Sequence, residues 1–544
     1  MFNMKRFGIL LLSLLMALTV MMALASCAGT DTMTGATPPP EDVQSSYADT
    51  QVSGGGEDVL RVAAGRNFFQ GSSSNIFVHF STNIWEALVL FDDDMEPEMW
   101  LAKSIESSDD GLVWTITLNE GIVFHDGSAL TADVAAFNLE RLFRWNPATA
   151  SIDPDFARPG EFGNIVDFDV VSEYVFTVTH AEPIPDFTSR LAMSNSAMFA
   201  MASFDADGAI TNPYGTGAFL FSSYDEVSQI IRLERFEQYH RGLAAVETVY
   251  FLNIPDPVTR LAALQSGEID VIADVGGVMP QQAAAIELNE NLVLKYRQVS
   301  TVHYLGINSN EGALFSDARL RTAVSLSVDR ESIVDILLLG YGAAAISVLT
   351  DLSTDWVIDG HYSFSNIGAD MIAEAATGGV IPDAVFLLNS AWTGRWPYAD
   401  VAAMLQSELA EAGIRLSIET VDNATWNERV RNSDYDIIIH PATVTSGEPT
   451  NFFQRFLHSG GADNITRGHG ISNPEIDALI ERASTELDRS TRISIARELQ
   501  TIVSRENYII PIWYDVTLYA MNTRVQNFGL DVQFRPDLFL VELS

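Results

Sequence analysis

The sequence predicts an α/β protein with more than one packed domain. Strand-like and helix-like segments alternate along it: the run Leu112–Leu118 alternates apolar and polar side chains, whereas apolar residues recur at helical spacing after Asn473. The chain has 544 residues, of which 47% are hydrophobic, and a chain of this size exceeds the usual limit of a single hydrophobic core. Interleaved strands and helices in such a chain indicate α/β domains.

The first 26 residues have the layout of a secretory signal peptide. Two basic residues, Lys5 and Arg6, precede an apolar run from Phe7 to Ala25, and this segment has no acidic residue. The chain's single cysteine, Cys27, directly follows the sequence Leu-Ala-Ser, which resembles the bacterial lipobox. We therefore expect cleavage before Cys27 and lipidation of its thiol. An uncleaved signal anchor is the alternative, because the apolar run is about long enough to cross a bilayer.

Residues 27–58 are expected to form a flexible tether. They are rich in Thr, Gly, Pro, Ser and acidic residues, including consecutive prolines at 38–40 and consecutive glycines at 54–56. Such a composition has little apolar surface to bury. The packed body is therefore expected to begin near Val59, and no second long apolar run follows it.

Charge and cysteine content exclude several classes of protein. Asp and Glu total 72 against 31 Lys and Arg, which gives a formal net charge of -41. So negative a surface repels nucleic acid and anionic lipid headgroups, so neither is expected as a partner. One cysteine cannot form an intrachain disulfide, a cysteine-rich zinc site or an iron–sulfur cluster.

Motifs of the common enzyme classes are missing from the sequence. It has no nucleophile elbow, no His-Glu-x-x-His zinc motif and no phosphate-binding loop. The segment Gly215–Gly217 has no third glycine at dinucleotide-binding spacing and is interpreted as a turn. The nine histidines are scattered, with no pair at i, i+4. We therefore predict a protein that is not an enzyme and has neither a cofactor nor a metal site; a secreted hydrolase is a distant alternative.

A series of segments in a fixed order does point to a family. These segments are Trp100–Ser104, Asp109–Gly111, Trp114–Leu118, Gly121–Gly127, Thr131–Val134, Tyr214–Phe219, Ile254–Pro257, Gln265–Val271, Phe315–Arg321 and Val328–Arg330. As an ordered set they resemble the extracellular solute-binding proteins of family 5, the peptide- and nickel-binding receptors of ABC importers. The resemblance covers essentially all of the chain from Val59 onward.

The resemblance implies a two-lobed periplasmic-binding-protein-like fold, in which two α/β lobes enclose a ligand by hinge closure. It places the two crossings between the lobes near residues 298–304 and 508–514. The expected parts are lobe I (residues 59–297 and 513–544), its extra subdomain (about 85–210) and lobe II (residues 298–512).

Three segments are expected to face the cleft between the lobes: one directly after the first crossing, one rich in aromatic residues, and the loop from His440 to Glu448. Tryptophan can stack on an organic ligand or cover a core, and both roles stay open for the two tryptophans concerned. The candidate ligand-binding residues are His303, Tyr304, Asn308, Trp392, Trp396, His440, Thr443, Thr445 and Glu448.

The loop before Pro449 departs from both patterns of the family. In peptide-binding relatives an Asp before a Glu/Asp-Pro pair meets the peptide ammonium, and Thr445 stands at about that place here. Charge pairing to a peptide N-terminus would then have to come from Glu448 or from elsewhere in the chain. The Thr-Trp-Gly that nickel-binding relatives tend to carry is also missing, and no counterpart of their chelate-binding arginines is obvious.

We therefore predict a lipid-anchored, monomeric receptor on the outer face of the cell membrane, or on the periplasmic side if an outer membrane is present. It captures a small solute and delivers it to an ABC permease and its ATPases, without chemistry of its own. An oligopeptide is the expected solute, and a receptor for nickel or a metal chelate is the alternative.

Overall fold

The computed structural model describes residues 58–69, 78–157, 159–193, 196–358, 362–365, 383–411, 413–444 and 447–544. The predicted signal peptide, Cys27, the tether up to residue 57 and Thr445 lie outside these residues. The elements below all belong to one compact unit, Val52–Ser544. Within the described ranges, no helix is both long and apolar enough to cross a membrane.

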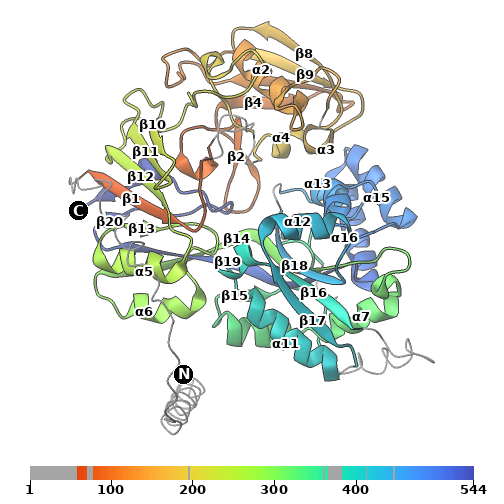
Figure 1. Ribbon diagram of the computed structural model, residues 1–544. Helices are drawn as coiled ribbons and strands as arrows, with labels where there is room; N and C mark the ends of the chain where they lie inside the picture. Colours follow the sequence, from red (N-terminus) through yellow and green to blue (C-terminus); the bar gives the residue numbers. More distant parts are fainter. Residues whose placement is uncertain are drawn as a thin grey trace. The chain divides into compact units, whose positions relative to one another are not determined.

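One long mixed sheet organises the described part of the chain (Figure 1). Its strands follow the order β10-β11-β12-β1-β13-β19-β14-β18-β16-β17, and β15 pairs with β19. β1 is parallel to β12 and β13, and β16 is parallel to β17 and β18. The strands are β1 (Val59–Ala64), β10 (Phe219–Asp225), β11 (Ile230–Arg235), β12 (Thr248–Asn253), β13 (Val271–Ile272), β14 (Leu292–Ile307), β15 (Gly342–Ala344), β16 (Ala384–Asn389), β17 (Leu416–Val421), β18 (Ile437–Thr443) and β19 (Ile509–Asn522).

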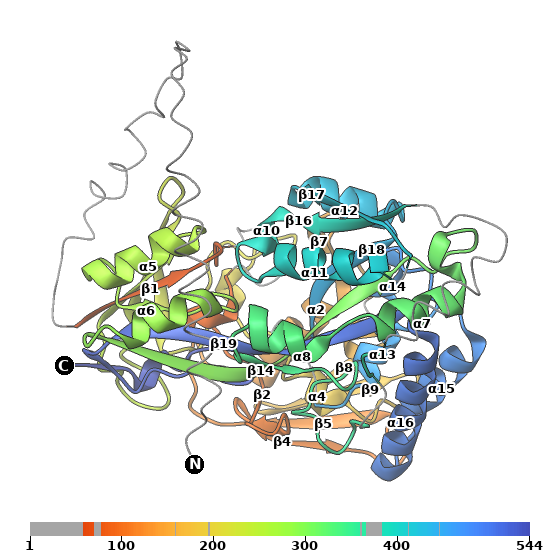
Figure 2. The ribbon, with the colours of Figure 1, turned by 90° about the horizontal axis from the view of Figure 1, so that it is seen from below.

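The antiparallel strands β14 and β19 connect the two ends of this sheet. They have 16 and 14 residues, and their pairing register shifts between Gln298 and Val302 and again between His303 and Tyr304. We call the end with β1 lobe I and the end with β16 to β18 lobe II. Figure 2 shows the two strands side by side, with α5 (Pro257–Ser266) and α6 (Ala283–Glu287) at one end and α15 (Pro474–Thr485) and α16 (Arg489–Glu506) at the other. The boundaries expected at 297/298 and 512/513 therefore fall inside paired strands.

Lobe I is held by apolar side chains from both faces of its strands. Leu60, Phe251 and Met521 belong to one buried cluster, and α5 and α6 cover a second cluster on the opposite face. α5 ends at Gly267, whose φ of 77° is left-handed, and β13 follows shortly afterwards. Glycine adopts this conformation without steric cost, so Gly267 ends the helix and lets the chain turn into the strand.

A separate four-stranded antiparallel sheet, β4-β5-β9-β8, packs against α2 within residues 85–210. The strand-like runs at 112–118 and 174–178 form β5 and β9 of this sheet. α2 begins after Thr131, although the Thr131 side chain makes no capping hydrogen bond. The elements of this region are β2 (Val89–Phe91), β3 (Pro97–Met99), β4 (Ala102–Ser107), β5 (Val113–Leu118), α2 (Ala132–Arg144), β6 (Trp145–Asn146), β7 (Ser151–Ile152), α3 (Pro159–Phe162), β8 (Ile165–Ser172), β9 (Val175–His180) and α4 (Phe187–Arg190).

Lobe II carries most of its helices on β16 to β18 and on the crossing strands. The helix predicted after Asn473 is present, and the Asn473 side chain accepts hydrogen bonds from the backbone N–H groups of Glu475 and Ile476. It ends at Thr485, so Leu487 lies beyond the helix. The helices of this lobe are α7 (Ala318–Leu326), α8 (Arg330–Ser332), α10 (Ser390–Thr393), α11 (Tyr398–Glu411), α12 (Asn423–Arg431), α13 (Thr450–Phe456), α14 (Ala462–Thr466), α15 (Pro474–Thr485) and α16 (Arg489–Glu506). The short strands β20 (Val525–Gln526) and β21 (Glu542–Leu543) pair with each other and pack on the core of lobe I.

Candidate functional site

The carboxyl ends of strands from both lobes bring charged residues to the lobe boundary. In lobe I, Arg66 follows β1 and Asp274 follows β13, each two residues after its strand ends. In lobe II, Arg395 lies in the segment between α10 and α11, which follows β16. Ligands of open α/β sheets bind outside the carboxyl ends of the strands. The topology therefore directs all three residues toward the position expected for a ligand.

Asp274 contacts arginines from both lobes. Arg66 donates to its Oδ1 from Nε at 3.2 Å and from Nη2 at 3.0 Å, and Nη2 of Arg395 lies 3.7 Å from its Oδ2. Arg395 also donates from Nη2 to the backbone oxygen of Val275 at 2.6 Å. Burial lowers the pKa of Arg395, and the neighbouring Asp274 carboxylate opposes this shift. Asp274 thus ties the segment after β16 to lobe I.

His303 and Asp515 lie on the two crossing strands beside this ion pair. His303 is fully buried and stacks on Trp513, with ring centroids 4.2 Å apart. Its Nδ1 shares a hydrogen bond of 2.7 Å with the Tyr398 hydroxyl, and its Nε2 faces Asp515 Oδ2 at 3.6 Å. Burial lowers the pKa of His303, and Asp515 opposes the shift. Arg395 acts electrostatically on Tyr398, so the charged and aromatic groups form one set.

We call this set the interlobe cluster. Trp396 packs edge-on against His303 at 5.1 Å and stacks on Tyr398 at 5.5 Å, and the Arg395 guanidinium lies 4.7 Å from the Trp396 ring centroid. Of the predicted candidates, the cluster contains His303 and Trp396. Its members are Arg66, Asp274, His303, Arg395, Trp396, Tyr398 and Asp515.

Three other predicted residues form a second aromatic group next to it. Tyr304 packs edge-on against His440, with ring centroids 4.1 Å apart, and the Trp392 ring lies 6.5 Å from that of His440. Tyr304 and His440 are buried, whereas Trp392 is half-buried. No described residue makes a hydrogen bond to the Tyr304 hydroxyl or to Nε2 of His440. Trp396 belongs to a buried hydrophobic cluster and Trp392 packs against that cluster, so both tryptophans contribute to packing, and Trp392 keeps part of its surface exposed.

Glu448, Asn308 and Thr443 are engaged within the protein. Glu448 accepts two hydrogen bonds from Arg492, at 2.9 Å to Oε2 and 2.7 Å to Oε1. Burial raises its pKa, and Arg492 opposes the shift. The Asn308 amide donates to two backbone oxygens, and the Thr443 hydroxyl bonds to Thr301 at 3.0 Å. The two oxygens of Glu448 are thus already occupied in this arrangement.

The buried histidines of lobe II do not assemble a metal site within the described residues. The rings of His440 and His469 stack with centroids 5.8 Å apart, and His469 Nδ1 shares a hydrogen bond with the Tyr435 hydroxyl. In the described part of the chain, no group of three or more His, Cys, Asp or Glu side chains is placed to hold a metal ion.

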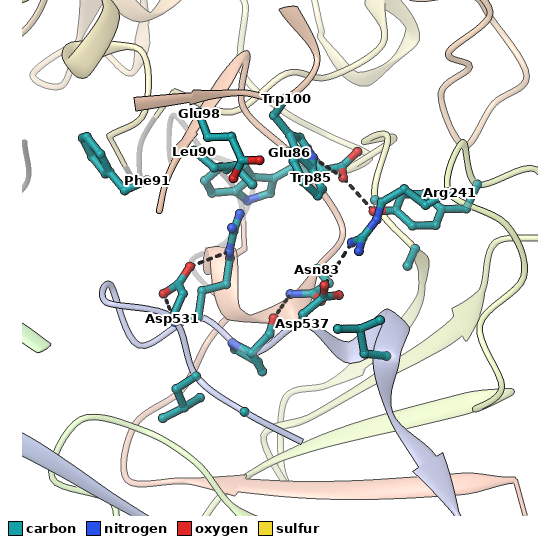
Figure 3. Close-up of a pocket in the computed structure, with 18 of the residues that line it drawn as sticks. Asn83, Trp85, Glu86, Leu90, Phe91, Glu98, Trp100, Arg241, Asp531 and Asp537 are labelled. Atoms are coloured by element: carbon teal, nitrogen blue, oxygen red, sulfur yellow. Dashed lines mark hydrogen bonds and ion pairs between the residues drawn. The ribbon is translucent and has the colours of Figure 1, made fainter. Parts of the chain in front are cut away.

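A pocket of about 360 Å³ lies elsewhere, between residues 83–100, 217–241 and 527–540 of lobe I (Figure 3). None of the predicted candidates lines it. Glu86 at its wall accepts hydrogen bonds from Trp100, Thr216, Tyr239 and His240. Thr216 belongs to the segment interpreted as a turn, and a Cβ added to Gly215 would lie 2.1 Å from the backbone oxygen of Ile84. The glycine segment is therefore structural.

Comparison with known families identifies the chain. The sequence profile of the bacterial extracellular solute-binding proteins, family 5 Middle, matches residues 96–464, which is more than half of the chain. The chain belongs to this family. A family 5 solute-binding protein has two lobes, and the expected two-lobed α/β fold is confirmed by the solved structures that resemble it.

Relatives of this family 5 protein have different ligands in their names. Heme-binding protein A of Haemophilus influenzae is 24% identical, and the alignment covers 82% of this chain and 84% of the relative. The periplasmic binding protein DppA of Helicobacter pylori in complex with peptide STSA has a TM-score of 0.75 at 19% identity, covering 89% of this chain and 98% of its own. NikA of Staphylococcus aureus in complex with Ni(L-His)2 has a TM-score of 0.74 at 21% identity, covering 90% and 100%. These structural likenesses show the fold.

Sequence reasoning missed several charged residues of the interlobe cluster in this solute-binding protein. Arg395 and Tyr398 flank Trp396 in a segment that was singled out for its aromatic residues, so their position carried a signal. Asp274 and Asp515 carried none, because they are two of 72 acidic residues. Strand pairing alone brings these residues to the boundary, since β13 and β14 both pair with β19.

Proposed function

We propose that this solute-binding protein is the receptor of an ABC importer and that it encloses an oligopeptide between its lobes. The observation that carries this proposal is the composition of the interlobe cluster, in which Arg66 and Arg395 stand beside Asp274 and Asp515. A peptide has an ammonium at one end and a carboxylate at the other, so it offers a partner to groups of both signs. Aromatic rings such as Trp396 supply apolar surface for the body of the ligand.

Closure of the lobes would complete the binding site. Asp274 of lobe I and Arg395 of lobe II meet only while the lobes are close together, and Arg489 of lobe II similarly reaches Glu96 at 3.0 Å. A ligand that contacts both lobes binds the closed arrangement more tightly and shifts the population toward it. The closed, loaded receptor would then deliver the solute to the permease, with no covalent chemistry.

Ligand binding tests this proposal directly. The protein purified from its host is analysed by native mass spectrometry, and its melting temperature is measured with a library of tripeptides to pentapeptides. A ligand at 100 times its Kd adds about 2.7 kcal/mol to the free energy of unfolding, so the melting temperature rises measurably. Absence of both a bound peptide and a thermal shift contradicts the proposal, and stoichiometric nickel in elemental analysis supports the metal-chelate alternative instead.

We also propose that lipid on Cys27 holds the receptor on the extracytoplasmic face of the membrane. The variant Cys27→Ser is expected to move from the membrane fraction to the soluble extracytoplasmic fraction, because a lipid anchor needs the thiol. Ser45→Ala, in the predicted tether, is the matched control and stays with the membrane. Retention of Cys27→Ser on the membrane after its first 26 residues have been removed, as judged from the mass of the protein, would refute the anchor.

A further inference from the structure

Asp515 is a buried carboxylate whose Oδ2 lacks a hydrogen-bond donor among the described residues. It lies on β19 with only 5% of its surface exposed, and its Oδ2 is fully buried. The nearest group of opposite potential charge is His303, at 3.6 Å from Nε2 to Oδ2. That separation is longer than a hydrogen bond. A buried carboxylate oxygen without a donor is unfavourable, so this place in the cluster is chemically incomplete.

Two other acids near the boundary are each bonded to an arginine, although Oδ2 of Asp274 likewise lacks a hydrogen-bond donor among the described residues. Asp274 Oδ1 accepts from Arg66 and from the backbone N–H of Val275, and both oxygens of Glu448 are bound by Arg492. A further cation added at either place would compete with an arginine already bonded there. Asp515 has no such arginine at hydrogen-bond distance among the described residues, although Arg395 contributes to its electrostatic surroundings.

Asp515 lies on β19 at the point where the pairing of β19 with β14 is irregular. The β14–β19 register shifts between Gln298 and Val302, and the paired positions on β19 are Val516 and Tyr514. Asp515 lies between these two residues and is paired on its other side with Gly342 of β15. Register shifts of this kind turn side chains out of the regular ladder and are frequent next to functional sites. The carboxylate is therefore held by rigid strands at the junction of both lobes.

We propose that Asp515 accepts the ammonium group of the bound solute and so selects ligands with a free amine. This inference rests on the proposed function and names the group that would receive the peptide N-terminus. Glu448, the acid expected in that role from the sequence, is already bonded to Arg492. An ammonium supplies up to three N–H donors. Charge-assisted hydrogen bonds are about twice as strong as neutral ones, so the amine would contribute strongly to ligand discrimination.

The test compares two ligand sets on three proteins. The probes are an equimolar library of unmodified tripeptides and the same library after N-acetylation. The proteins are the wild type, Asp515→Asn and Asp400→Asn, the last being an exposed acid in the first turn of α11 that removes the same charge outside the cluster. Bound fractions are measured by native mass spectrometry, and affinities of the best pair by calorimetry.

The wild type and Asp400→Asn are expected to bind the unmodified member of the best pair about ten- to a hundredfold more tightly than its acetylated form. Asp515→Asn is expected to reduce this preference to within about threefold, mainly by weakening binding of the free amine. A preference unchanged in Asp515→Asn overturns the inference and leaves the proposed function standing. Equal binding of both ligands by the wild type also overturns it, whether or not the variant folds. A wild type that binds neither library overturns the proposed function.

Discussion

Glu86 and Asp515 are two buried carboxylates of the same protein with very different surroundings. Glu86 accepts hydrogen bonds at 2.7 to 3.0 Å from Trp100, Tyr239, Thr216 and His240. Burial by itself would raise its pKa, but the donors, with His240 foremost, leave it lowered. Oδ2 of Asp515 has no hydrogen-bond donor among the described residues, and His303 Nε2 lies 3.6 Å from it. The comparison teaches that a saturated acid belongs to the scaffold, whereas an acid left open inside the molecule is suited to an incoming partner.

The saturated acid should produce the largest loss of stability when it is removed. Glu86→Leu leaves buried donors without an acceptor, so the free energy of unfolding should fall by about 3–5 kcal/mol in urea titrations. Glu98→Gln, an exposed acid of the same pocket, is the control and should change it by less than about 0.5 kcal/mol. Equal effects of the two variants would show that the donor network around Glu86 does not stabilise the fold.

The Glu448–Arg492 pair should give an intermediate effect. Arg492→Met leaves the Glu448 carboxylate largely buried without its two donors, so unfolding should become easier by about 2 kcal/mol. The double variant Glu448→Gln, Arg492→Met removes the stranded charge and should recover part of this loss. Denaturant titration of the three proteins measures the difference. A single variant as stable as the wild type would mean that Glu448 does not depend on Arg492.

Buried histidines should make stability depend on pH by a smaller amount. Burial lowers the pKa of His469 to about 3, against about 6.5 in an unfolded chain. Below pH 6.5 the unfolded state therefore binds a proton that the folded state does not, and stability is lost as the pH falls from about 6.5 toward 3.

His469→Gln removes this term, so its loss of stability between pH 7.5 and pH 5 should be smaller than that of the wild type by about 1–2 kcal/mol. Melting temperatures measured across this range provide the comparison. Tyr435→Phe keeps the imidazole and removes only its hydroxyl partner, so it should retain the pH dependence of the wild type. Parallel pH curves for the wild type and His469→Gln would contradict the assignment.

Local features of the fold were predictable because their causes are local. The helix predicted after Asn473 is present, and the Asn473 cap and the left-handed Gly267 act within a few residues. Thr131 marks the start of α2 without its capping bond, since the preference of threonine for this position does not fix where its hydroxyl points. Leu487 continues a helical pattern beyond Thr485, where the helix has already ended.

The candidate site was predictable only in part because its contacts are distant in sequence. Aromatic residues are rare enough to be recognised as candidates in the sequence. The rings of His303 and Trp396 are in contact although the two residues lie 93 positions apart in the chain. Acidic residues are common, so nothing in the sequence distinguishes Asp515 from the others. The same holds for Arg492, which contacts an acid 44 residues away. Such pairs are fixed by strand order and helix packing, which a single sequence does not reveal.

The order of strands in the sheet has a consequence for how the protein is made. β13 and β14 do not pair with each other; each pairs with β19, which follows every other strand of the sheet along the chain. During synthesis and export from the first residue onward, each end of the sheet can form as its own strands emerge, but their union waits for β19. The last folding step is therefore a long-range pairing, which is typically slow. Until it occurs, the edges of β13 and β14 are exposed to other chains.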